Sequence, residues 1–491
     1  MIRHHEYTHV FGMGILNSAD LLVVAFYLVG ITIVGSLFYR RHTNTEEYLL
    51  GGKGVNWLVA AMSIIAADTS AITYLGLPAW SFTHDLKMLV AGVTVIMAVP
   101  IVVRFFLPIY SKGGIYTAYQ YLEQRFDIRV RILASVFFLL IRGAHVAVII
   151  YAPALMMAEL MQVPLLYSVL GMAVLTGFYT SLGGIKAVVW TDSIQVITVM
   201  VGFTAVAVSA LAAVPGGLGE VLRTAGDKLV FYDFSWQPNT IDNSWLLLIC
   251  YTLLNVQAMS TDQAVLQKYL TTRSARETTK SLLLYGLSSI PLFLLLCFLG
   301  VILHVFYAQH PEVRASLKNP DAVVAHFAAT QLRAGLAGLV VASIFAGSMS
   351  TVSASLNSLA TSTVIDFYQR LFRPGMDDRH YATASRWATL GWTVLATGGA
   401  LYAGKLGALI FAFTKIQGVM GGVILGIFLS GILIRKATPR GVLVAAALGL
   451  AAVLSVSILT QTAMNWYVLI GCGGTMAAAW GLTLAARESN A

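Results

Sequence analysis

The chain has 491 residues, of which 58% are hydrophobic and only 11% are Asp, Glu, Lys or Arg. A soluble globular protein carries about 25% charged residues, so this composition excludes a soluble enzyme, a nucleic-acid-binding protein and a disordered chain. A membrane helix needs about 20 apolar residues, and the length has room for about a dozen such spans.

Thirteen apolar stretches are long enough to be membrane helices. In chain order they cover residues 18–39, 55–79, 85–109, 128–160, 163–181, 184–213, 243–270, 279–308, 330–367, 383–404, 407–434, 438–462 and 465–486. They are continuous runs rather than alternating segments of about 10 residues, which excludes a transmembrane β-barrel. The sequence therefore predicts an all-α integral membrane protein.

Basic residues are shared unequally between the two sides that alternate loops define. Most of the 31 Lys and Arg residues fall on one side, among them Arg104, Arg131, Lys268, Arg276 and Arg435. Cytoplasmic loops carry the excess of Lys and Arg, so we expect the N-terminus outside the cell membrane and the C-terminus in the cytoplasm. This topology explains the net charge of +9 without a nucleic acid or an acidic ligand.

The span at 55–79 contains a carboxylate, Asp68, followed by Thr69, Ser70 and Thr73. Ionisable residues inside a membrane are costly, and they mark functional sites by default. Oxygen ligands are those that a hard cation prefers, so the cluster predicts a site for Na⁺ or for a polar solute. A structural carboxylate paired with neighbouring helices is the alternative.

The span at 330–367 carries a second group of small and hydroxyl-bearing residues. Gly347, Ser350 and Thr351 are spaced i, i+3, i+4 and so share one helix face. Such a face can serve close helix packing alone, but together with Asp68 it favours a cation site. Other spans carry further ionisable residues, namely Arg142, His145, Asp192, Asp262 and Lys415.

Ordinary structural roles remain open for several of these ionisable residues. His145 suits a buried histidine bonded to a carbonyl, and Asp262 could pair with Lys268 or cap a helix. Lys415 is near enough to the outer end of its span to reach the interface.

Four strings resemble the sodium:solute symporter family. They are YTSLGGIKAVVWTDSIQV at 179–196, IYAPAL at 150–155, the segment 262–269 and STVSASLNS at 350–358. The similarity covers nearly the whole chain and is strongest to the iodide, monocarboxylate and multivitamin branch, with bacterial sialic-acid and proline carriers also similar. It implies a fold of the LeuT type, with two inverted five-helix repeats.

That fold divides the chain into five parts. They are a tail and leading helix (1–54), a first repeat (55–213), an extracellular loop (214–242), a second repeat (243–434) and trailing helices with the C-terminus (435–491). The first helix of each repeat would be broken, and discontinuous helices near the membrane midplane form the sites of such transporters.

The resemblance also implies ligands for Na⁺. The main sodium site maps onto five residues, the carbonyls of Ala66, Thr69 and Gly347 and the hydroxyls of Ser350 and Thr351. Asp68 matches an acidic residue that proline carriers have beside that site. A second sodium site of some members maps onto Asp192, Ser353 and position 354, where Ala354 lacks the expected hydroxyl.

We therefore expect a symporter that imports a small polar solute with Na⁺. An organic anion such as a carboxylate is the first choice, because His145 and Lys415 could meet it. His145 occupies the position at which sialic-acid carriers have an Arg that binds the substrate carboxylate. Ser70, Thr73 and Gln257 would hold a neutral or zwitterionic solute instead.

The expected partners are Na⁺, the solute and the lipid bilayer, with no nucleic acid and no obligate protein partner. A proton-coupled carrier of a zwitterion or sugar, with Asp68 as proton relay, is one alternative. A transporter-like membrane sensor is another, although the sequence ends soon after the last span, at Ala491. No nucleophile–base pair or HExxH-type metal motif indicates an enzyme.

Overall fold

The computed structural model describes residues 16–38, 45–111, 114–161, 163–235, 242–317, 319–403 and 409–488. Within these ranges the regular structure is helical, and the one β-bridge joins Val55 to Thr272.

The helices of the first part of the chain lead up to two long spans. They are α1 (Ser18–Ser36), α2 (Thr45–Leu50), α3 (Trp57–Asp68), α4 (Ala71–Thr83), α5 (Leu89–Ile101), η3 (Val102–Phe106), α6 (Leu107–Tyr110), α7 (Gln120–Arg125), α8 (Ile128–Met161) and α9 (Leu165–Ala213). The connection that follows α9 then forms α10 (Gly217–Thr224) and η4 (Gly226–Leu229).

The second part repeats this pattern and adds two helices at the end. Its elements are α11 (Ser244–Leu246), η5 (Leu247–Tyr251), α12 (Thr252–Ser260), α13 (Gln263–Tyr269), α14 (Ala275–Gln309), α15 (Pro311–Arg314), η6 (Pro320–Ala322), α16 (Val323–Gln331), α17 (Leu336–Ser362), η7 (Thr363–Phe372), α18 (Asp378–Ala403), α19 (Leu409–Leu433), α20 (Pro439–Leu459) and α21 (Trp466–Glu488).

Each of the thirteen predicted stretches falls on a helix of the described residues. Two of them, 163–181 and 184–213, are joined in α9 across a kink at Gly184, whose φ is 55°. A side chain there would meet the Tyr48 carbonyl oxygen at 2.7 Å, so the kink needs glycine. In the described part of the chain, nine helices are long and apolar enough to cross a membrane, or eleven with two bent pairs.

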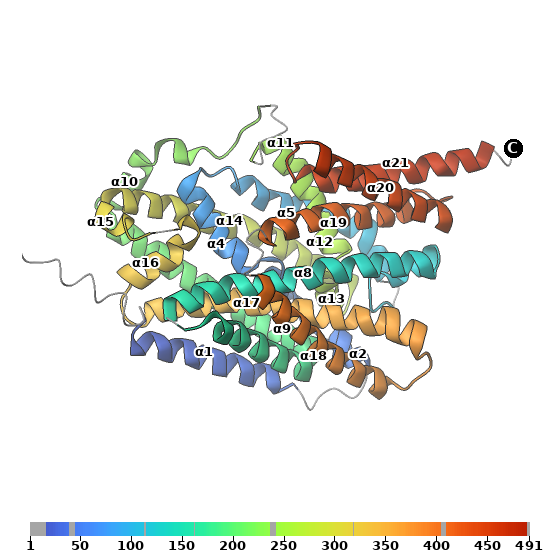
Figure 1. Cartoon of the computed structure of the whole chain (residues 1–491), viewed down its shortest axis with the longest axis horizontal. Helices are drawn as coiled ribbons and strands as arrows, with labels where there is room; N and C mark the ends of the chain where they lie inside the picture. The colour runs from blue at the N-terminus through green and yellow to red at the C-terminus, as the bar shows by residue number, and fades with distance from the viewer. Residues whose placement is uncertain are drawn as a thin grey trace, which may run out of the picture.

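The two bent pairs are broken helices at equivalent places in the two halves. The axis turns by 62° between α3 and α4, and by 60° between the segment Ser244–Ser260 and α13. At the first break Thr69 and Ser70 leave the helical conformation. In Figure 1 these short helices lie inside the bundle, among the long ones. Both breaks therefore expose backbone groups in the interior of the protein.

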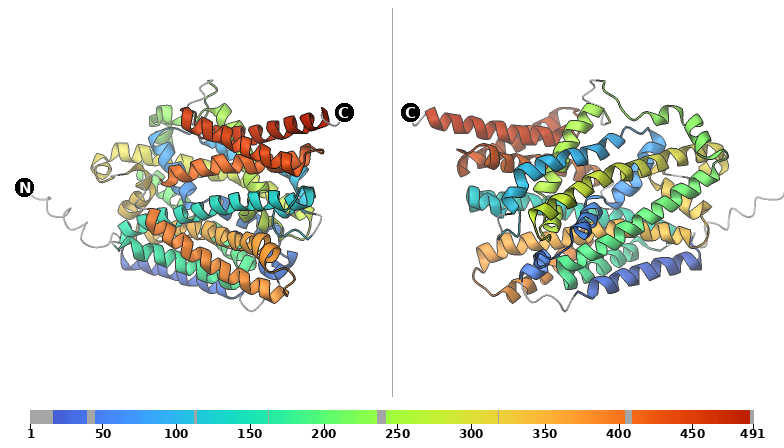
Figure 2. Two further views of the ribbon diagram at one scale, coloured as in Figure 1. Left: turned by 45° about the vertical axis from the view of Figure 1, so that its right-hand side comes forward. Right: turned by 180° about the vertical axis from the view of Figure 1, so that it is seen from behind.

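α17 is the central helix of the bundle. It packs against α9, α8 and α3, and nearly all of its side chains are buried. By contrast, α1 and α20 present large apolar side chains at the periphery, such as Phe26 (83% exposed) and Leu459 (80% exposed). Figure 2 shows α1 and the α20–α21 pair on opposite sides of the bundle. Lipid is the solvent that suits such exposed apolar faces.

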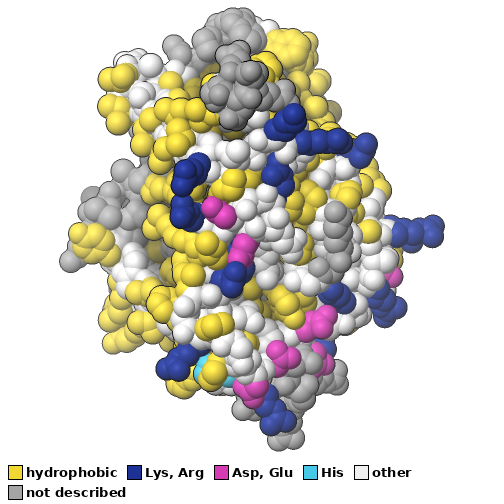
Figure 3. Space-filling view, turned by 90° about the vertical axis from the view of Figure 1, so that its right-hand side faces the viewer, with side chains coloured by type: hydrophobic (Ala, Val, Ile, Leu, Met, Phe, Trp, Pro, Cys, Tyr) yellow, Lys and Arg dark blue, Asp and Glu magenta, His cyan; other side chains and the backbone are white. Residues whose placement is uncertain are grey.

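Basic side chains gather at one end of the bundle, at the right of Figure 1. α1 begins at the other end and α21 ends at this one. Figure 3 views this end directly and shows more Lys and Arg than Asp and Glu. The exposed basic residues of the chain include Arg129, Arg373, Arg379, Arg435 and Lys436. Lys268, which the topology argument counted on this side, is instead fully buried on α13.

Candidate functional site

The break between α3 and α4 leaves backbone carbonyls free at the end of α3. The last carbonyls of a helix have no partner within that helix, and α3 ends at Asp68. The Ser350 hydroxyl, on α17, donates to the Ala66 carbonyl at 2.8 Å and to the Gly347 carbonyl at 3.0 Å. The Thr351 hydroxyl reaches the same two carbonyls, at 3.5 and 3.2 Å. Four of the five predicted sodium ligands thus form one hydrogen-bonded group.

The fifth predicted ligand, Thr69, is the residue at which α3 ends. It is buried, and its backbone N–H donates to the Ile65 carbonyl at 3.0 Å. Gly347 allows α17 to approach α4, because a side chain there would lie 2.8 Å from the Tyr74 ring. We call Ala66, Thr69, Gly347, Ser350 and Thr351 the oxygen cluster.

The oxygen cluster has the chemistry of a Na⁺ site. A hydroxyl has one donor hydrogen and two acceptor lone pairs, so each can turn its oxygen toward a cation that the same carbonyls hold. Hard cations take oxygen ligands. In the described part of the chain no three His, Cys, Asp or Glu side chains come together as a metal site.

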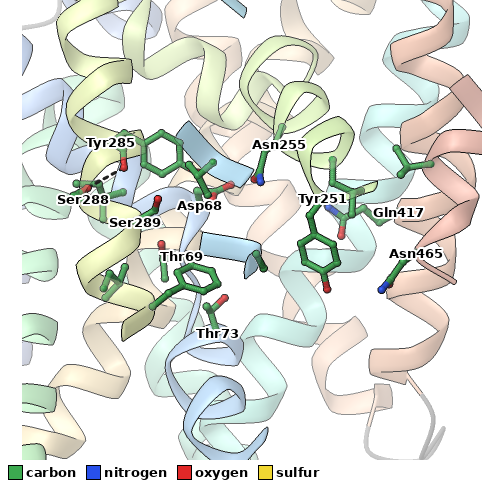
Figure 4. Close-up of a pocket in the computed structure, with 18 of the residues that line it drawn as sticks. Asp68, Thr69, Thr73, Tyr251, Asn255, Tyr285, Ser288, Ser289, Gln417 and Asn465 are labelled. Carbon is green, nitrogen blue, oxygen red and sulfur yellow. Dashed lines mark hydrogen bonds between the residues drawn. The ribbon is translucent and has the colours of Figure 1, made fainter. Parts of the chain in front are cut away.

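A cavity of about 300 Å³ adjoins the oxygen cluster. Its walls come from α3, α4, α5, α12, α14, α19 and the start of α21. Figure 4 shows its polar lining, which consists of Asp68, Thr69, Thr73, Tyr251, Asn255, Tyr285, Ser288, Ser289, Gln417 and Asn465. Among the described lining residues, Asp68 is the one charged side chain. The cavity is therefore rich in carboxamides and hydroxyls and carries one negative charge.

Asp68 links the cavity to the oxygen cluster. It lies between Ala66 and Thr69 in the chain, and its carboxylate accepts a hydrogen bond from the Tyr285 hydroxyl of α14. The Asn255 carboxamide donates to the Thr94 hydroxyl at 2.9 Å, which fixes the carboxamide beside Asp68. The solute cavity and the ion site thus share one short segment of chain.

The five residues predicted to bind the solute are not all brought together. Thr73 lines the cavity. Ser70 begins α4 at the break, and Gln257 points along its own helix toward Thr261, and neither is among the lining residues. The side chain of Lys415 lies outside the described residues.

His145, the remaining one, lies on α8 in contact with Arg142. Its Nδ1 is 2.9 Å from a guanidinium nitrogen of Arg142. The guanidinium also binds both carboxylate oxygens of Asp262, at 3.1 and 2.5 Å. Asp262 in turn caps α13 by accepting from the Ala264 N–H at 2.9 Å. Asp262 therefore pairs with Arg142 and not with Lys268, and the charge of Arg142 is neutralised.

Asp192, from the predicted second sodium site, is also paired. Its Oδ2 accepts from the Lys268 ammonium and, at 2.6 Å, from the Ser63 hydroxyl. Ser353 donates to the Ser350 carbonyl at 2.9 Å. Ala354 packs with Ala67 and Ala264 in a small apolar cluster. Both charges of this pair are fully buried.

At the second broken helix, the carbonyls before the break have different hydrogen-bond donors from those at the first. The hydroxyls of Tyr269, Tyr110 and Tyr119 donate to the last three carbonyls before the break, those of Met259, Ser260 and Thr261. The three distances lie between 2.6 and 3.0 Å. The carbonyls at the second break are thus bonded by tyrosine hydroxyls, whereas the Ala66 carbonyl at the first break is bonded by hydroxyls of α17.

Most of the uncharged polar residues that line the cavity were not predicted from the sequence. Tyr285, Asn255, Gln417 and Asn465 lie on elements far apart in the chain, and none belongs to a run of polar residues. The available signal is weak, since it consists of single carboxamides in otherwise apolar spans. Lys268 was considered only as a cytoplasmic loop charge or as a partner of Asp262, whereas the structure pairs it with Asp192.

Comparison with known proteins gives a consistent set of relatives. A model of the sodium:solute symporter family matches residues 48–449. The sodium/sialic acid symporter of Aliivibrio fischeri is 30% identical over 473 residues, which cover 93% of this chain and 91% of the relative. Human sodium-coupled monocarboxylate transporter 1 is 31% identical over 461 residues, covering 92% and 75%.

Solved structures agree with these sequence matches. A substrate-bound, outward-open Na⁺-coupled sialic acid symporter superposes with a TM-score of 0.90 at 27% identity, covering 95% of this chain and 98% of the other. A closed structure of Mhp1, a nucleobase-cation-symport-1 family transporter, has a TM-score of 0.58 at 14% identity, covering 90% and 95%, which shows a shared fold.

Proposed function

The chain belongs to the sodium:solute symporter family, and on that premise we propose that Na⁺ bound at the oxygen cluster drives uptake of a small polar organic solute bound in the adjoining cavity. The observation that carries the proposal is that both sites meet at the α3–α4 break. Thr69 belongs to the cluster and also lines the cavity, and Asp68 lies between them.

The sodium gradient is strong enough for this task. One charge that falls through 100 mV releases about 2.3 kcal/mol, and a tenfold concentration gradient adds about 1.4 kcal/mol. Together these amount to about 3.7 kcal/mol per ion, which supports a several-hundred-fold accumulation of solute. Inward transport at a ratio of one ion to one solute is therefore sufficient.

The coupling follows from what Na⁺ does to α3 and α17. The ion replaces direct hydrogen bonds between the hydroxyls of Ser350 and Thr351 and the carbonyl of Ala66, so it fixes the distance between the two helices. This sets the end of α3, and with it Asp68 and Thr73, in the wall of the cavity. The solute then binds to a wall that the ion has ordered, and inward opening releases both.

The first candidate solute is an organic acid with further hydrogen-bonding groups. Relatives that transport sialic acid and monocarboxylates support this choice. The carboxamides of Asn255, Gln417 and Asn465 suit hydroxyl and amide groups of such a molecule. His145 and Lys415 are the residues proposed to meet its negative charge, although His145 is not among the described lining residues of the cavity.

A zwitterion is the second candidate, because a specific feature favours it. Asp68 is the one charge among the described lining residues, and an ammonium group would pair with it. A proton-driven carrier would use the same carboxylate as its relay, without needing the hydroxyls of Ser350 and Thr351.

We expect Na⁺, and not K⁺ or a pH step, to stabilise the purified protein and to drive uptake. The reason is that the oxygen cluster offers five oxygen ligands at one place. Thermal unfolding in detergent with NaCl or KCl at equal ionic strength measures the first effect, and uptake of sialic acid, pyruvate or proline into proteoliposomes measures the second. Uptake that follows a proton gradient in Na⁺-free buffer would contradict the proposal.

Replacing Asp68 with Asn is expected to separate the two candidate solutes. A zwitterion loses a charge-assisted hydrogen bond, which costs about 1.5–3 kcal/mol, or about ten- to a hundred-fold in affinity. An organic acid should bind no more weakly, because a nearby negative charge is removed. Competition binding with proline and sialic acid measures the difference.

Tyr285→Phe is the matched control for this experiment, because it removes the hydrogen bond to Asp68 but keeps the carboxylate. If both variants weaken both solutes equally, the cavity wall has been disturbed and the assignment of Asp68 fails.

A further inference from the structure

A lysine and an aspartate form an isolated ion pair in the interior of the bundle. The Lys268 ammonium, on α13, contacts Oδ2 of Asp192, on α9. It also donates to the Ser63 hydroxyl of α3 at 2.8 Å. All three side chains are fully buried, and none of them lines the cavity. The pair therefore belongs to neither the solute cavity nor the basic end of the bundle.

Stability alone is a weak reason for such a pair. Removing two charges from water costs about as much as their attraction returns, and apolar replacements are often as stable. Here the pair also leaves Oδ1 of Asp192 without a hydrogen-bond partner among the described residues. A pair that is incompletely satisfied is better explained by a role in transport.

The position of the pair relates it to the ion site. Ser63 precedes the cluster residue Ala66 by one helical turn on α3. On α17, Ser353 follows Ser350 by three residues and donates to its carbonyl, and α17 packs against both α9 and α3. The Asp192 carboxylate thus lies in the same helix set that builds the oxygen cluster, one turn further along.

We infer that Lys268 acts as a tethered cation at Asp192, in place of a second Na⁺. This inference rests on the proposed function and specifies its stoichiometry as one Na⁺ per transport cycle. The ammonium neutralises the carboxylate and takes the Ser63 hydroxyl as a further partner. A sodium ion bound to the same carboxylate would lie beside a positive charge in a medium that screens poorly.

The surroundings of Asp192 agree with this assignment. Ala354, at the position where the family resemblance implies a hydroxyl, packs with Ala67 and Ala264. Its methyl group closes the packing between α17, α3 and α13 and offers no oxygen. The side chain of Ala354 therefore offers no oxygen ligand to an ion near Asp192.

The test counts sodium ions on the purified protein, with radiolabelled Na⁺ alone as the probe. We expect the wild-type protein to bind one Na⁺ with a Hill coefficient of about one. Lys268→Met leaves both oxygens of Asp192 for a cation, so it should bind two Na⁺ per molecule and show a steeper dependence of melting temperature on Na⁺.

The double variant Asp192→Asn with Lys268→Met removes both charges, and we expect it to return to one Na⁺. Lys186→Met is the control for loss of a lysine, because Lys186 forms a pair with Glu47 at 3.4 Å whose side chains are 24% and 29% exposed. It should bind one Na⁺ with wild-type affinity.

Two outcomes overturn the inference. One is a wild-type protein that binds two Na⁺, which can be measured even where Lys268→Met does not fold. The other is a folded Lys268→Met that binds one Na⁺ as the double variant does, since the lysine is then structural. A wild-type protein that binds no Na⁺ contradicts the proposed function itself and is distinct from both.

Discussion

Replacing Ser350 and Thr351 together with alanine is expected to abolish Na⁺-driven uptake in a protein that still folds. The two hydroxyls are two of the five oxygens of the cluster, and each also bridges α17 to the Ala66 carbonyl. Each single replacement should raise the Na⁺ concentration for half-maximal binding about tenfold, which corresponds to about 1.4 kcal/mol. Titration of thermal stability with Na⁺ measures both singles and the double variant.

Ser348→Ala is the matched control for these variants. Ser348 is equally buried on α17, but its hydroxyl donates to the Ile344 carbonyl of its own helix at 2.9 Å. Its Na⁺ dependence should therefore equal that of the wild type. Unchanged Na⁺ dependence in Ser350→Ala and Thr351→Ala as well would assign these hydroxyls to helix packing alone.

Arg142→Met is expected to destabilise the protein strongly. It leaves the Asp262 carboxylate buried without its guanidinium partner, and breaking a buried pair on one side costs about 3–5 kcal/mol. The second broken helix loses its anchor to α8 at the same time. Chemical unfolding in detergent should show the loss as a lower midpoint.

A double variant tests whether the ion pair is the cause. Asp262→Asn keeps a good cap for α13, because Asn and Asp are similar at this position, and in combination with Arg142→Met it removes the unpaired charge. We expect it to regain most of the lost stability. Arg223→Ala, which breaks an exposed pair with Glu220, should change stability by less than about 1 kcal/mol. Equal losses in the single and double variants would point to packing.

The helices, and the residues of α17 that meet the end of α3, could be predicted because their signals are local. A span is visible as a continuous apolar run, and Gly347, Ser350 and Thr351 share a face by spacing alone. Asp68 stood out as a charge in an apolar span. The family resemblance supplied the remaining partner, the end of α3. The family model that matches residues 48–449 confirms this resemblance.

The solute cavity and the ion pairs could not be predicted, because they depend on contacts between distant segments. Asp192 and Lys268 are 76 residues apart, and Arg142 and Asp262 are 120 apart. A charge seen in the sequence gives no sign of its partner, so the sequence could not show that Asp262 pairs with Arg142 rather than with Lys268. The carboxamides of the cavity are single residues on separate helices, and only the packing of α12, α19 and α21 brings them together.

The tyrosine hydroxyls at the second break link the end of α12 to residues near α6 and α7 through hydrogen bonds. Tyr110 ends α6 and Tyr119 precedes α7, and their hydroxyls hold the carbonyls of Ser260 and Thr261. When the end of α12 near the break tilts, Tyr110 and Tyr119 either move with it or give up these buried hydrogen bonds. At the first break, the hydrogen bonds found among the described residues for the Ala66 carbonyl come from side chains of α17. The two halves of the chain are therefore similar in shape but differ at their breaks. The carbonyls of the first break are bonded by α17 hydroxyls that can share them with an ion, whereas those of the second break are already bonded by three tyrosine hydroxyls.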